Sequence, residues 1–373
     1  MNSPFCQDRI AAAKIMVVGC GALGNEVLKN LALMGAEHLT LVDFDRVEES
    51  NLSRSVLFTR ADEGKYKVDV AAARLSQINP RMSVETIRGD IAFDVGLGRV
   101  REMDVVIGCV DNRWARYCIN RLCMRAGVPW VDGGIGALEG TARVFAPGKN
   151  CYACQLGPEG LKDLKRRMPC SGIIRRNEEA GKAPTTSVIA SVIGAVQVQE
   201  ALKLLHQDKL SDGELTSLCG RMFCYEGEHL TTKVVEFQAW DGDCPVHERW
   251  EPAGVVAVNV GTTVDAALAI LREQTASDKV TLYLTGDCFV DRVIKKDGDE
   301  ELEVMLPGRA VAARLEQDAH WRGVPLSGLY QREYREIDEK FPYKSLTLGQ
   351  LGIPARDVLL VGTPAGEVYL EME

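Results

Sequence analysis

Apolar runs and amphipathic segments alternate through the first two thirds of the chain. Residues 14–19 form an apolar, β-branched run typical of a buried parallel strand, and residues 25–34 repeat apolar positions at helical spacing. The same reading predicts strands at residues 38–42, 84–87 and 104–110 and a helix at residues 67–77. This order predicts an α/β fold with a doubly wound parallel sheet.

The pattern continues with longer and less regular segments. It predicts a helix at residues 115–126, strands at 129–132 and 140–145, a loop or short helix at 157–182, a long helix at 186–205 and an antiparallel pair at 221–225 and 233–238. Residues 248–254 then interrupt the apolar pattern. We therefore expect an N-terminal domain over residues 1–250 and a smaller α+β domain over residues 254–373.

Charge and cysteine content narrow the class of protein. The 373 residues carry a net charge of −9, which argues against a nucleic-acid surface. No segment reads as a secretory signal, and the apolar run at 188–205 is interrupted by polar residues, so we expect a packed helix, no membrane contact and a cytoplasmic protein. Its twelve cysteines are then thiols, metal ligands or a nucleophile.

Three glycines follow the first predicted strand. Gly19, Gly21 and Gly24 have the spacing that lets a backbone loop and a helix N-terminus approach a phosphate. Asp43 ends the next strand, nineteen residues after Gly24, where a carboxylate can hold ribose hydroxyls. These residues alone fit a nicotinamide dinucleotide as well as ATP.

Further polar residues favour a triphosphate with Mg²⁺. Arg54 and Lys67 supply cations for phosphates and departing pyrophosphate, and Asp111 is a carboxylate at a strand end, where it can hold the metal. Asn51 lies just before Arg54, and Asp45 either binds ligand or holds the turn. Taken singly, Arg54 and Lys67 fit solvated surface charges equally well, but the ordered set favours ATP.

The motifs also carry a family resemblance. GCGALGNEVLKNLALMGAEHLTLVDFDRVEESNLSR, GKYKVDVAA and CVDNRWARYCINRLC resemble the Rossmann-like adenylation domain of ubiquitin-activating enzymes and of the sulfur-carrier adenylyltransferases, the ThiF/MoeB/HesA superfamily. The resemblance covers residues 14–247 and implies attack of a C-terminal glycine carboxylate on ATP. It implies phosphate contacts from Gly19, Gly21, Gly24, Asn51, Arg54 and Lys67, ribose binding by Asp43 and Mg²⁺ binding by Asp111.

The chain departs from the family pattern at two places. Ser55 stands where family members usually have glutamine after the arginine. Homodimeric members also carry an N-terminal arginine that reaches the partner's ATP, and Arg9 is the only basic residue before Lys14. The resemblance therefore implies either a homodimer or a heterodimer in which a second activating subunit supplies the arginine.

Two pairs of potential metal ligands flank the second half of this domain. Each pair has the two-residue spacing of a zinc knuckle, and together they offer a Cys₃His structural zinc site. Cys219 and Cys224 are competing ligands that we interpret as strand residues. The predicted ligands are Cys151, Cys154, Cys244 and His247.

Cys170 is the candidate nucleophile. It lies in RRMPCSGIIRR, where nearby arginines favour the thiolate, although an ordinary loop cysteine would look the same. Its place after a C-x-x-C pair is similar to that of the thioester cysteine in the catalytic subunit of SUMO-type activators, with Ser171 in place of the usual threonine. The catalytic-cysteine segment, residues 155–185, is short.

The C-terminal domain opens as strand, helix and strand over residues 255–284. Its end, SLTLGQLGIPARDVLLVGTPAGEVYLEME, resembles the ubiquitin-fold domain with which activating enzymes recruit a conjugating enzyme. A generic α+β appendage is the alternative. The insertion at 307–343 has no assignment, and its charged run at 331–340 reads as a solvated helix face.

The sequence as a whole indicates an ATP-dependent activating enzyme for a ubiquitin-like protein. We expect adenylation of the protein's C-terminal glycine, thioester formation on Cys170 and transfer to a conjugating enzyme. Alternatives are a sulfur-carrier adenylyltransferase without a thioester, a non-catalytic scaffold that binds a ubiquitin-like protein and, as the least favoured, a nicotinamide dehydrogenase.

Overall fold

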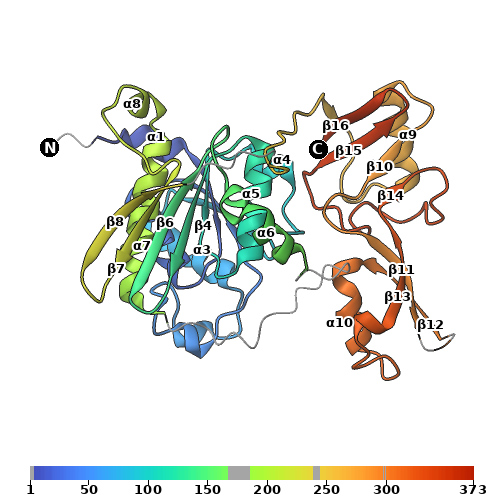
Figure 1. The fold of residues 1–373 in the computed structure, drawn as a ribbon, viewed down its shortest axis with the longest axis horizontal. Coiled ribbons are helices and arrows are strands. Elements are labelled where there is room, and N and C mark those ends of the chain that lie inside the picture. Colours follow the sequence, from blue (N-terminus) through green and yellow to red (C-terminus); the bar gives the residue numbers. More distant parts are fainter. Residues whose placement is uncertain (1–3, 167–184, 238–243, 297, 299) are drawn as a thin grey trace. The chain divides into compact units, whose positions relative to one another are not determined.

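The computed structural model divides the chain into two compact units. It describes residues 4–166, 185–237, 244–296, 298 and 300–373. The first unit comprises Met1–Ala92, Val100–Leu161 and Glu179–Arg249, and the second comprises Phe93–Arg99, Lys162–Glu178 and Trp250–Glu373. Figure 1 shows the helices and strands of both units.

The N-terminal unit is built on a mixed sheet, which has eight strands among the described residues, in the order β3-β2-β1-β4-β5-β6-β7-β8. The strands are β1 (Lys14–Val18), β2 (His38–Val42), β3 (Ser83–Ile87), β4 (Val105–Gly108), β5 (Trp130–Ile135), β6 (Glu139–Phe145), β7 (Arg221–Glu226) and β8 (Thr231–Glu236). The first five run parallel, and β6, β7 and β8 continue the sheet antiparallel. The doubly wound α/β fold and the antiparallel pair are confirmed.

Helices cover both faces of this sheet. The helices along this part of the chain are α1 (Gln7–Ala12), α2 (Ala22–Leu33), α3 (Lys67–Ile78), α4 (Leu97–Arg101), α5 (Arg113–Ala126), α6 (Tyr152–Arg166), α7 (Ser187–Leu204) and α8 (Gln207–Ser211), with short 3₁₀ turns at Glu49–Asn51 and Arg60–Asp62. The start of α4 and the end of α6 belong to segments of the second unit. Figure 1 shows α7 and α5 on opposite faces. Ile15 and Val17 of β1 pack with α2 and α7 in one core cluster, whereas Met16 is buried on the other face. Burial on both faces explains the continuous apolar run of this strand.

The start of the segment predicted as a loop or short helix, residues 157–182, is helical. Within the described residues α6 is helical from Tyr152 to Arg166, with a kink at Gly157, whose φ of 63° is in the left-handed region. Pro158 follows the kink and suits the first turn of the second helical part. The Gly and Pro content that suggested a loop therefore marks a break between two helical pieces.

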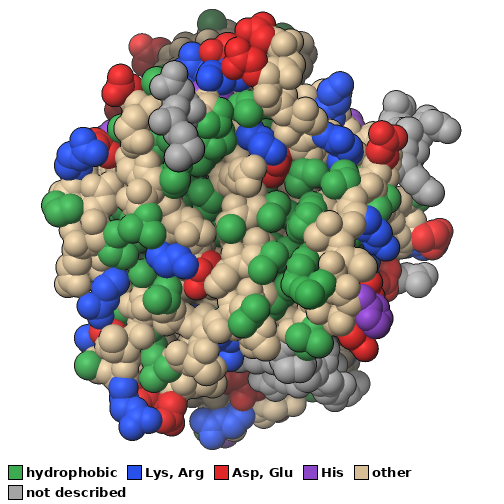
Figure 2. All heavy atoms as spheres, turned by 90° about the vertical axis from the view of Figure 1, so that its left-hand side faces the viewer, with side chains coloured by type: hydrophobic (Ala, Val, Ile, Leu, Met, Phe, Trp, Pro, Cys, Tyr) green, Lys and Arg blue, Asp and Glu red, His purple; other side chains and the backbone are tan. Residues whose placement is uncertain are grey.

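Helix α7 is apolar on nearly every side. By length and composition it is the one helix among the described residues that is long and apolar enough to cross a membrane, and 56% of it is buried in the structure. It packs against α2, β5 and β6, which accounts for most of its apolar surface. Val188 of α7 and Leu230, Val234 and Val235 at β8 remain exposed. Figure 2 shows hydrophobic side chains gathered on the face of the molecule that lies on the left in Figure 1.

The C-terminal unit contains two small sheets. Within the described chain, one has five strands in the order β14-β10-β15-β16-β9 and the other has three in the order β12-β11-β13. The elements are β9 (Val255–Val256), α9 (Val264–Thr275), β10 (Thr281–Tyr283), β11 (Phe289–Lys295), β12 (Glu301–Pro307), α10 (Val311–Glu316), β13 (Leu329–Tyr334), β14 (Glu336–Ile337), β15 (Val358–Thr363) and β16 (Gly366–Met372), with 3₁₀ turns at Gly308–Ala310 and Leu326–Gly328. Helix α9 packs on the larger sheet through Val264, Leu268 and Leu271. The unit is therefore α+β, and a ubiquitin fold stays a prediction.

Two local predictions for this unit are wrong. The charged run at 331–340 is not a helix, because it contains the end of β13 and all of β14. The first strand predicted for this domain, which the apolar pattern places over residues 255–260, is limited to Val255–Val256. Strand β13 pairs with β11, and Arg332 on it reaches the buried Asp291. Such cross-strand partners cannot be read from the local charge pattern.

A segment from the first half of the sequence belongs to the C-terminal unit. In Phe93–Arg99, the buried Leu97 donates its backbone N–H to Asp357 Oδ1 at 2.8 Å. A Cβ atom on Gly96 would lie 2.4 Å from the Ala355 carbonyl oxygen, so the two backbones touch. These are contacts between residues more than 250 positions apart, which local sequence patterns do not indicate.

Asp291 is a fully buried carboxylate in this unit. It accepts hydrogen bonds from Arg332 Nε at 2.8 Å, Tyr343 Oη at 2.7 Å and Tyr334 Oη at 3.2 Å. Burial by itself raises the pKa of Asp291, but the Arg332 and Tyr343 hydrogen bonds outweigh it, so the pKa lies below its usual value. This network joins β11, β13 and the loop that contains Tyr343.

Replacing Asp291 by alanine is expected to destabilise the C-terminal unit by about 2–3 kcal/mol, because the change removes hydrogen bonds to a buried carboxylate, whereas its ion-pair partner Arg332 is about half exposed and adds little. Tyr343→Phe, which removes one hydrogen bond, should cost about 1 kcal/mol. Scanning calorimetry of the full chain measures both. Since the folded pKa is lowered, the stabilisation is present above the unfolded pKa and disappears as pH falls through the folded pKa. Equal stability of wild type and Asp291→Ala at pH 7 would contradict this account.

Candidate nucleotide and metal sites

The loop between β1 and α2 is shaped by its glycines. Gly19 has φ +94°, and a Cβ atom there would lie 2.5 Å from the Cys109 carbonyl oxygen. A Cβ atom on Gly24 would lie 2.0 Å from the Gly19 carbonyl oxygen. At Gly21, by contrast, a Cβ atom would meet nothing within 4 Å. The loop is thus tightly packed at Gly19 and Gly24 and open at Gly21, where a ligand can approach the backbone.

The N-terminus of α2 suits an anion. Its N-cap residue is Gly21, and no side chain in the described part of the chain caps it. Its first turn contains no acidic residue, so nothing there repels negative charge. The unpaired N–H groups and the helix dipole together favour a phosphate at this point.

Asp43, at the end of β2, is bound to the same loop. Its Oδ2 accepts the Cys20 N–H at 2.7 Å, and its Oδ1 accepts the Asp45 N–H at 2.7 Å. Burial raises the pKa of Asp43 above its usual value, and the nearby Lys67 charge opposes that rise. The carboxylate therefore holds the glycine loop against the end of β2, beside the position predicted for ribose.

Lys67 is the first residue of α3, and its side chain is 10% exposed. Its Nζ lies 2.9 Å from Asp45 Oδ2, and its backbone N–H donates to the Asp45 carbonyl oxygen at 3.0 Å. Asp45 is about half exposed. The pair places one ammonium group at the start of α3. Asp45 contacts Lys67 through both its carboxylate and its backbone carbonyl oxygen, which connects the turn after β2 to α3.

Asn51 and Arg54 lie in the segment between β2 and α3. Asn51 is buried, and its Oδ1 accepts the Glu48 N–H at 3.0 Å. The Arg54 guanidinium donates to the Ser50 carbonyl oxygen at 2.7 Å. Asn51 therefore shapes the turn that carries Arg54. Ser55 is buried, and its hydroxyl has no hydrogen-bond partner among the described residues.

Asp111 is exposed in the turn between β4 and α5. Asn112 caps α5 by accepting the Ala115 N–H at 2.7 Å, and it donates to Asp111 Oδ1 at 3.3 Å. Strands β1, β2 and β4 are parallel neighbours, so their carboxyl ends bring the glycine loop, Asp43 and Asp111 to one edge of the sheet.

A buried charge network supports the Asp111 turn, and the sequence reading missed it. Arg116 donates to the carbonyl oxygens of Val110 at 2.8 Å and Gly133 at 3.0 Å, and its Nε donates to Asp132 Oδ1 at 3.0 Å. Asp132 is fully buried and also accepts from Arg143 Nε at 3.0 Å. Arg116 thereby fixes the residue that precedes Asp111. The available signal was the VDGG motif, a charged residue within an apolar strand.

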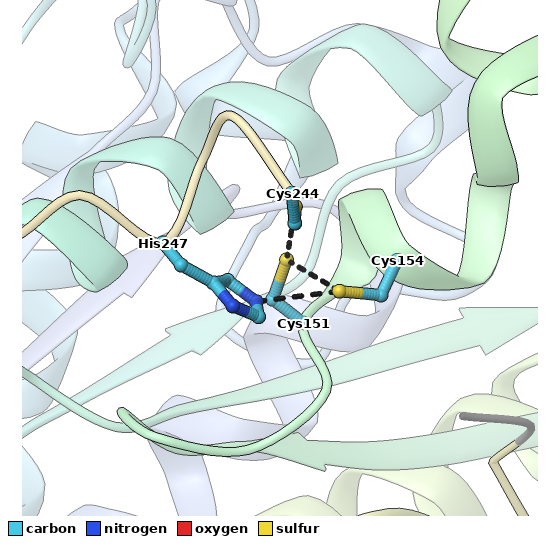
Figure 3. Close-up of side chains that lie close together, drawn as sticks. All are labelled: Cys151, Cys154, Cys244 and His247. Carbon is cyan, nitrogen blue, oxygen red and sulfur yellow. Dashed lines mark hydrogen bonds between the residues drawn. The ribbon is translucent and has the colours of Figure 1, made fainter. Parts of the chain in front are cut away.

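The four predicted zinc ligands come together in the N-terminal unit (Figure 3). Cys151 and Cys154 lie at the start of α6, and Cys244 and His247 lie in the segment after β8. Their ligand atoms all lie within 4.8 Å of one another. The two cysteines on α6 are buried, which suits a structural site.

The spacing of these atoms fits a tetrahedral metal ion. Zinc at about 2.3 Å from each thiolate sulfur separates two sulfurs by about 3.8 Å. The Sγ atom of Cys151 lies 3.7 Å from that of Cys154 and 3.8 Å from that of Cys244. His247 Nε2 lies 3.3 Å from Cys154 Sγ. These distances are close to those of a tetrahedral zinc site, whereas Cys224 lies in β7 and pairs within the sheet.

Two other predicted residues have different outcomes. Cys170 lies outside the described residues, as does Ser171. Arg9 lies on α1, and its Nη2 donates to Asp208 Oδ2 at 3.0 Å. In this chain, the arginine before the first strand therefore pairs with the same chain's α8 region.

Comparison with known proteins identifies the family. The model of the ThiF family matches residues 3–246. This chain belongs to the ThiF family. The match covers the unit that contains the glycine loop, Asp43, Lys67 and Asp111, and it ends before the C-terminal unit.

Relatives of this ThiF-family chain include both activating enzymes and adenylyltransferases. The SAMP-activating enzyme E1 of Haloferax volcanii is 34% identical over 243 residues, which are 65% of this chain and 83% of that protein. The molybdopterin-synthase adenylyltransferase of Haemophilus influenzae is 30% identical over 62% of this chain and 87% of its own length. The SUMO-activating enzyme subunit 2 of Dictyostelium discoideum is 34% identical over 150 residues, 40% of this chain and 23% of that protein.

Solved structures agree with the fold of the ThiF-family unit. Escherichia coli MccB with succinimide has a TM-score of 0.52 and 25% identity, covering 64% of this chain and 68% of that one. The predicted superfamily is thus confirmed by sequence and by fold. These relatives divide between activating enzymes and adenylyltransferases, so family membership supports adenylation without choosing between the two activities.

Proposed function

We propose that this chain adenylates the C-terminal carboxylate of a small carrier protein, using MgATP and releasing pyrophosphate. The observation that carries the proposal is the meeting of the glycine loop, Asp43, Lys67 and Asp111 at one sheet edge of a ThiF-family unit. The relatives named as activating enzymes and adenylyltransferases support the same chemistry. A nicotinamide dehydrogenase makes no use of Lys67 and Asp111.

The chemistry follows from the charges at this edge. A carboxylate oxygen of the carrier attacks the α-phosphorus of ATP, a new P–O bond forms, and the bond to the pyrophosphate oxygen breaks. Lys67 and Arg54 stabilise the negative charge that develops on the phosphates, and the N-terminus of α2 orients them. Asp111 would hold Mg²⁺, which supplies further charge neutralisation. Asp43 would hold the ribose.

A thioester step on Cys170 extends this proposal. The Cys170 thiolate attacks the carbonyl carbon of the acyl adenylate, forms a C–S bond and expels AMP. Four arginines near Cys170 in sequence favour the thiolate form. The C-terminal unit would then recruit a conjugating enzyme. The SUMO-activating and SAMP-activating relatives favour a ubiquitin-like protein as the carrier.

The second candidate is adenylation of a sulfur-carrier protein without a thioester on Cys170. Two relatives favour it: the molybdopterin-synthase adenylyltransferase and the sulfur carrier protein adenylyltransferase of Thermus thermophilus, which is 34% identical over 54% of this chain and 72% of its own length. In this case the acyl adenylate passes directly to a sulfur donor. Both candidates share pyrophosphate release, and they differ in the covalent adduct.

A second protein chain fits the exposed apolar side chains of α7 and β8. Val188 and Leu230 are 71% and 79% exposed, and Figure 2 shows hydrophobic side chains gathered on the face of the molecule that it draws. A homodimer or a second activating subunit would cover them. With Arg9 paired to Asp208, a heterodimeric partner that supplies its own arginine is the version we favour.

The test uses MgATP and small carrier proteins that end in glycine, with wild type and Cys170→Ala. Pyrophosphate release and gels with and without reductant give the readout. We expect pyrophosphate release from both proteins and a reducible adduct with the wild type alone. Release without any adduct would select the sulfur-carrier route. No release with any ubiquitin-like or sulfur-carrier protein, with and without a second activating subunit, would overturn the adenylation proposal.

A further inference from the structure

Asn25, in the first turn of α2, is a fully buried amide that makes three hydrogen bonds to backbone groups. Its Nδ2 donates to the Cys20 carbonyl oxygen at 2.8 Å and to the Gly21 carbonyl oxygen at 3.0 Å. Its Oδ1 accepts the Leu57 N–H at 2.8 Å. One side chain therefore joins the glycine loop to a segment 32 positions further along the chain.

The segment bound by Asn25 is the one that carries Arg54. Leu57 and Phe58 are buried in the core cluster that includes α2, so they anchor the end of this segment. Asn51 fixes its beginning through the Glu48 N–H. Arg54 lies between these two anchors. The hydrogen bond between Asn25 and Leu57, beside the packing of Leu57 and Phe58, therefore connects the segment that carries Arg54 to the glycine loop.

The glycine loop is held from two sides. The Cys20 N–H donates to Asp43 Oδ2 at 2.7 Å, and the Cys20 carbonyl oxygen accepts from Asn25. These bonds fix the peptide planes on either side of Cys20 and hence the direction of the N–H groups that follow. An orientation set before the ligand arrives raises affinity, because less order has to be created on binding.

We propose that Asn25 is a positioning residue for the nucleotide: it sets the orientation of the glycine loop and the spacing between this loop and Arg54. The inference rests on the proposed function, since it assumes that the triphosphate binds at this loop. Asn25 does not touch the nucleotide and acts through Cys20, Gly21 and Leu57. Its loss leaves the Cys20 carbonyl oxygen and the Leu57 N–H without these partners, whereas the Gly21 carbonyl oxygen still accepts the backbone N–H of residue 25 at 2.9 Å.

The experiment is equilibrium binding of MgATP to the full chain by calorimetry, with unfolding temperatures measured in parallel. We expect Asn25→Ala to raise the Kd for MgATP about 10- to 100-fold, as loss of a few hydrogen bonds predicts. Asn25→Asp keeps the size but sets a carboxylate against two carbonyl oxygens near the phosphates, so its Kd should rise at least as much.

Asn79→Ala is the matched control. Asn79 is also buried in the N-terminal unit, where it donates to the Ala36 carbonyl oxygen at 3.0 Å and accepts the Arg81 N–H at 3.2 Å. Its loss should lower the unfolding temperature as Asn25→Ala does but leave the Kd for MgATP within about twofold of wild type. An equal rise in Kd for both variants would overturn the inference in favour of general destabilisation.

Asn25→Ser separates the hydrogen bond to Gly21 from those to Cys20 and Leu57 and covers the case in which Asn25→Ala fails to fold. A serine hydroxyl in a helix can donate to the carbonyl four residues earlier, which is Gly21 here, but is too short to accept from Leu57. We expect this variant to fold and to bind MgATP with a higher Kd than the wild type. Wild-type affinity in Asn25→Ser would overturn the inference while leaving the proposed function intact, whereas a wild-type chain that does not bind MgATP would overturn both.

Discussion

Replacing Lys67 by alanine is expected to lower carrier-dependent pyrophosphate release about 100- to 1,000-fold, the usual cost of removing one group that stabilises transition-state charge. Lys67 is suited to this because its side chain is mostly buried at the start of α3 and its ammonium group is held 2.9 Å from Asp45. A cation in a largely desolvated position acts more strongly on phosphates than one in water. The measurement is initial rate at saturating MgATP.

Lys65→Ala provides the control for that variant. Lys65 precedes α3 by two residues, pairs with Asp62 at 3.0 Å and has a side chain that is 58% exposed. Its removal should change the rate less than twofold, since exposed ion pairs contribute little. If Lys67→Ala keeps the wild-type rate, the ammonium group has no part in the reaction and the phosphate site lies elsewhere.

Removing zinc is expected to lower the unfolding temperature of the N-terminal unit by at least about 10 °C, because structural zinc sites contribute several kcal/mol to folding. The ligands join the start of α6 to the segment after β8, which lie about ninety residues apart in sequence. Native mass spectrometry of the purified chain should show one zinc ion per chain. Chelation or Cys151→Ser should remove it and produce the same loss of stability.

Cys6→Ser is the control for zinc, since Cys6 is an exposed cysteine outside the cluster. It should keep both the metal and the wild-type unfolding temperature. A chain purified without metal that gains neither zinc nor stability when zinc is added would show that the four residues are held by packing alone.

Much of the N-terminal unit could be predicted from sequence because its central parallel strands, such as β1 and β4, are largely apolar. A strand buried on both faces, such as β1, needs a continuous apolar run, and its helices need apolar positions at helical spacing. The glycine loop was visible for a similar reason, since close backbone packing at Gly19 and Gly24 tolerates no side chain. The predicted zinc ligands were visible from their paired spacing.

Other features depended on contacts that no local pattern contains. The charged run at 331–340 contains strand residues because β13 pairs with β11 and Arg332 donates a hydrogen bond to Asp291. No local pattern distinguishes Asn25 from other polar helix residues. It connects two segments only because the folded chain places the Leu57 N–H within hydrogen-bond distance of its side chain. Asp132 likewise gained significance from two arginines on other elements.

The sequence by itself determined the α/β class, the glycine loop and the chemical types of the candidate ligands, because these depend on side-chain size, polarity and spacing along one segment. Only the tertiary structure decided which carboxylates meet which cations, which cysteines converge with His247, and that residues 93–99 join the C-terminal unit. Some of those contacts join segments more than 250 positions apart. They stabilise the protein only once folding has brought the segments together.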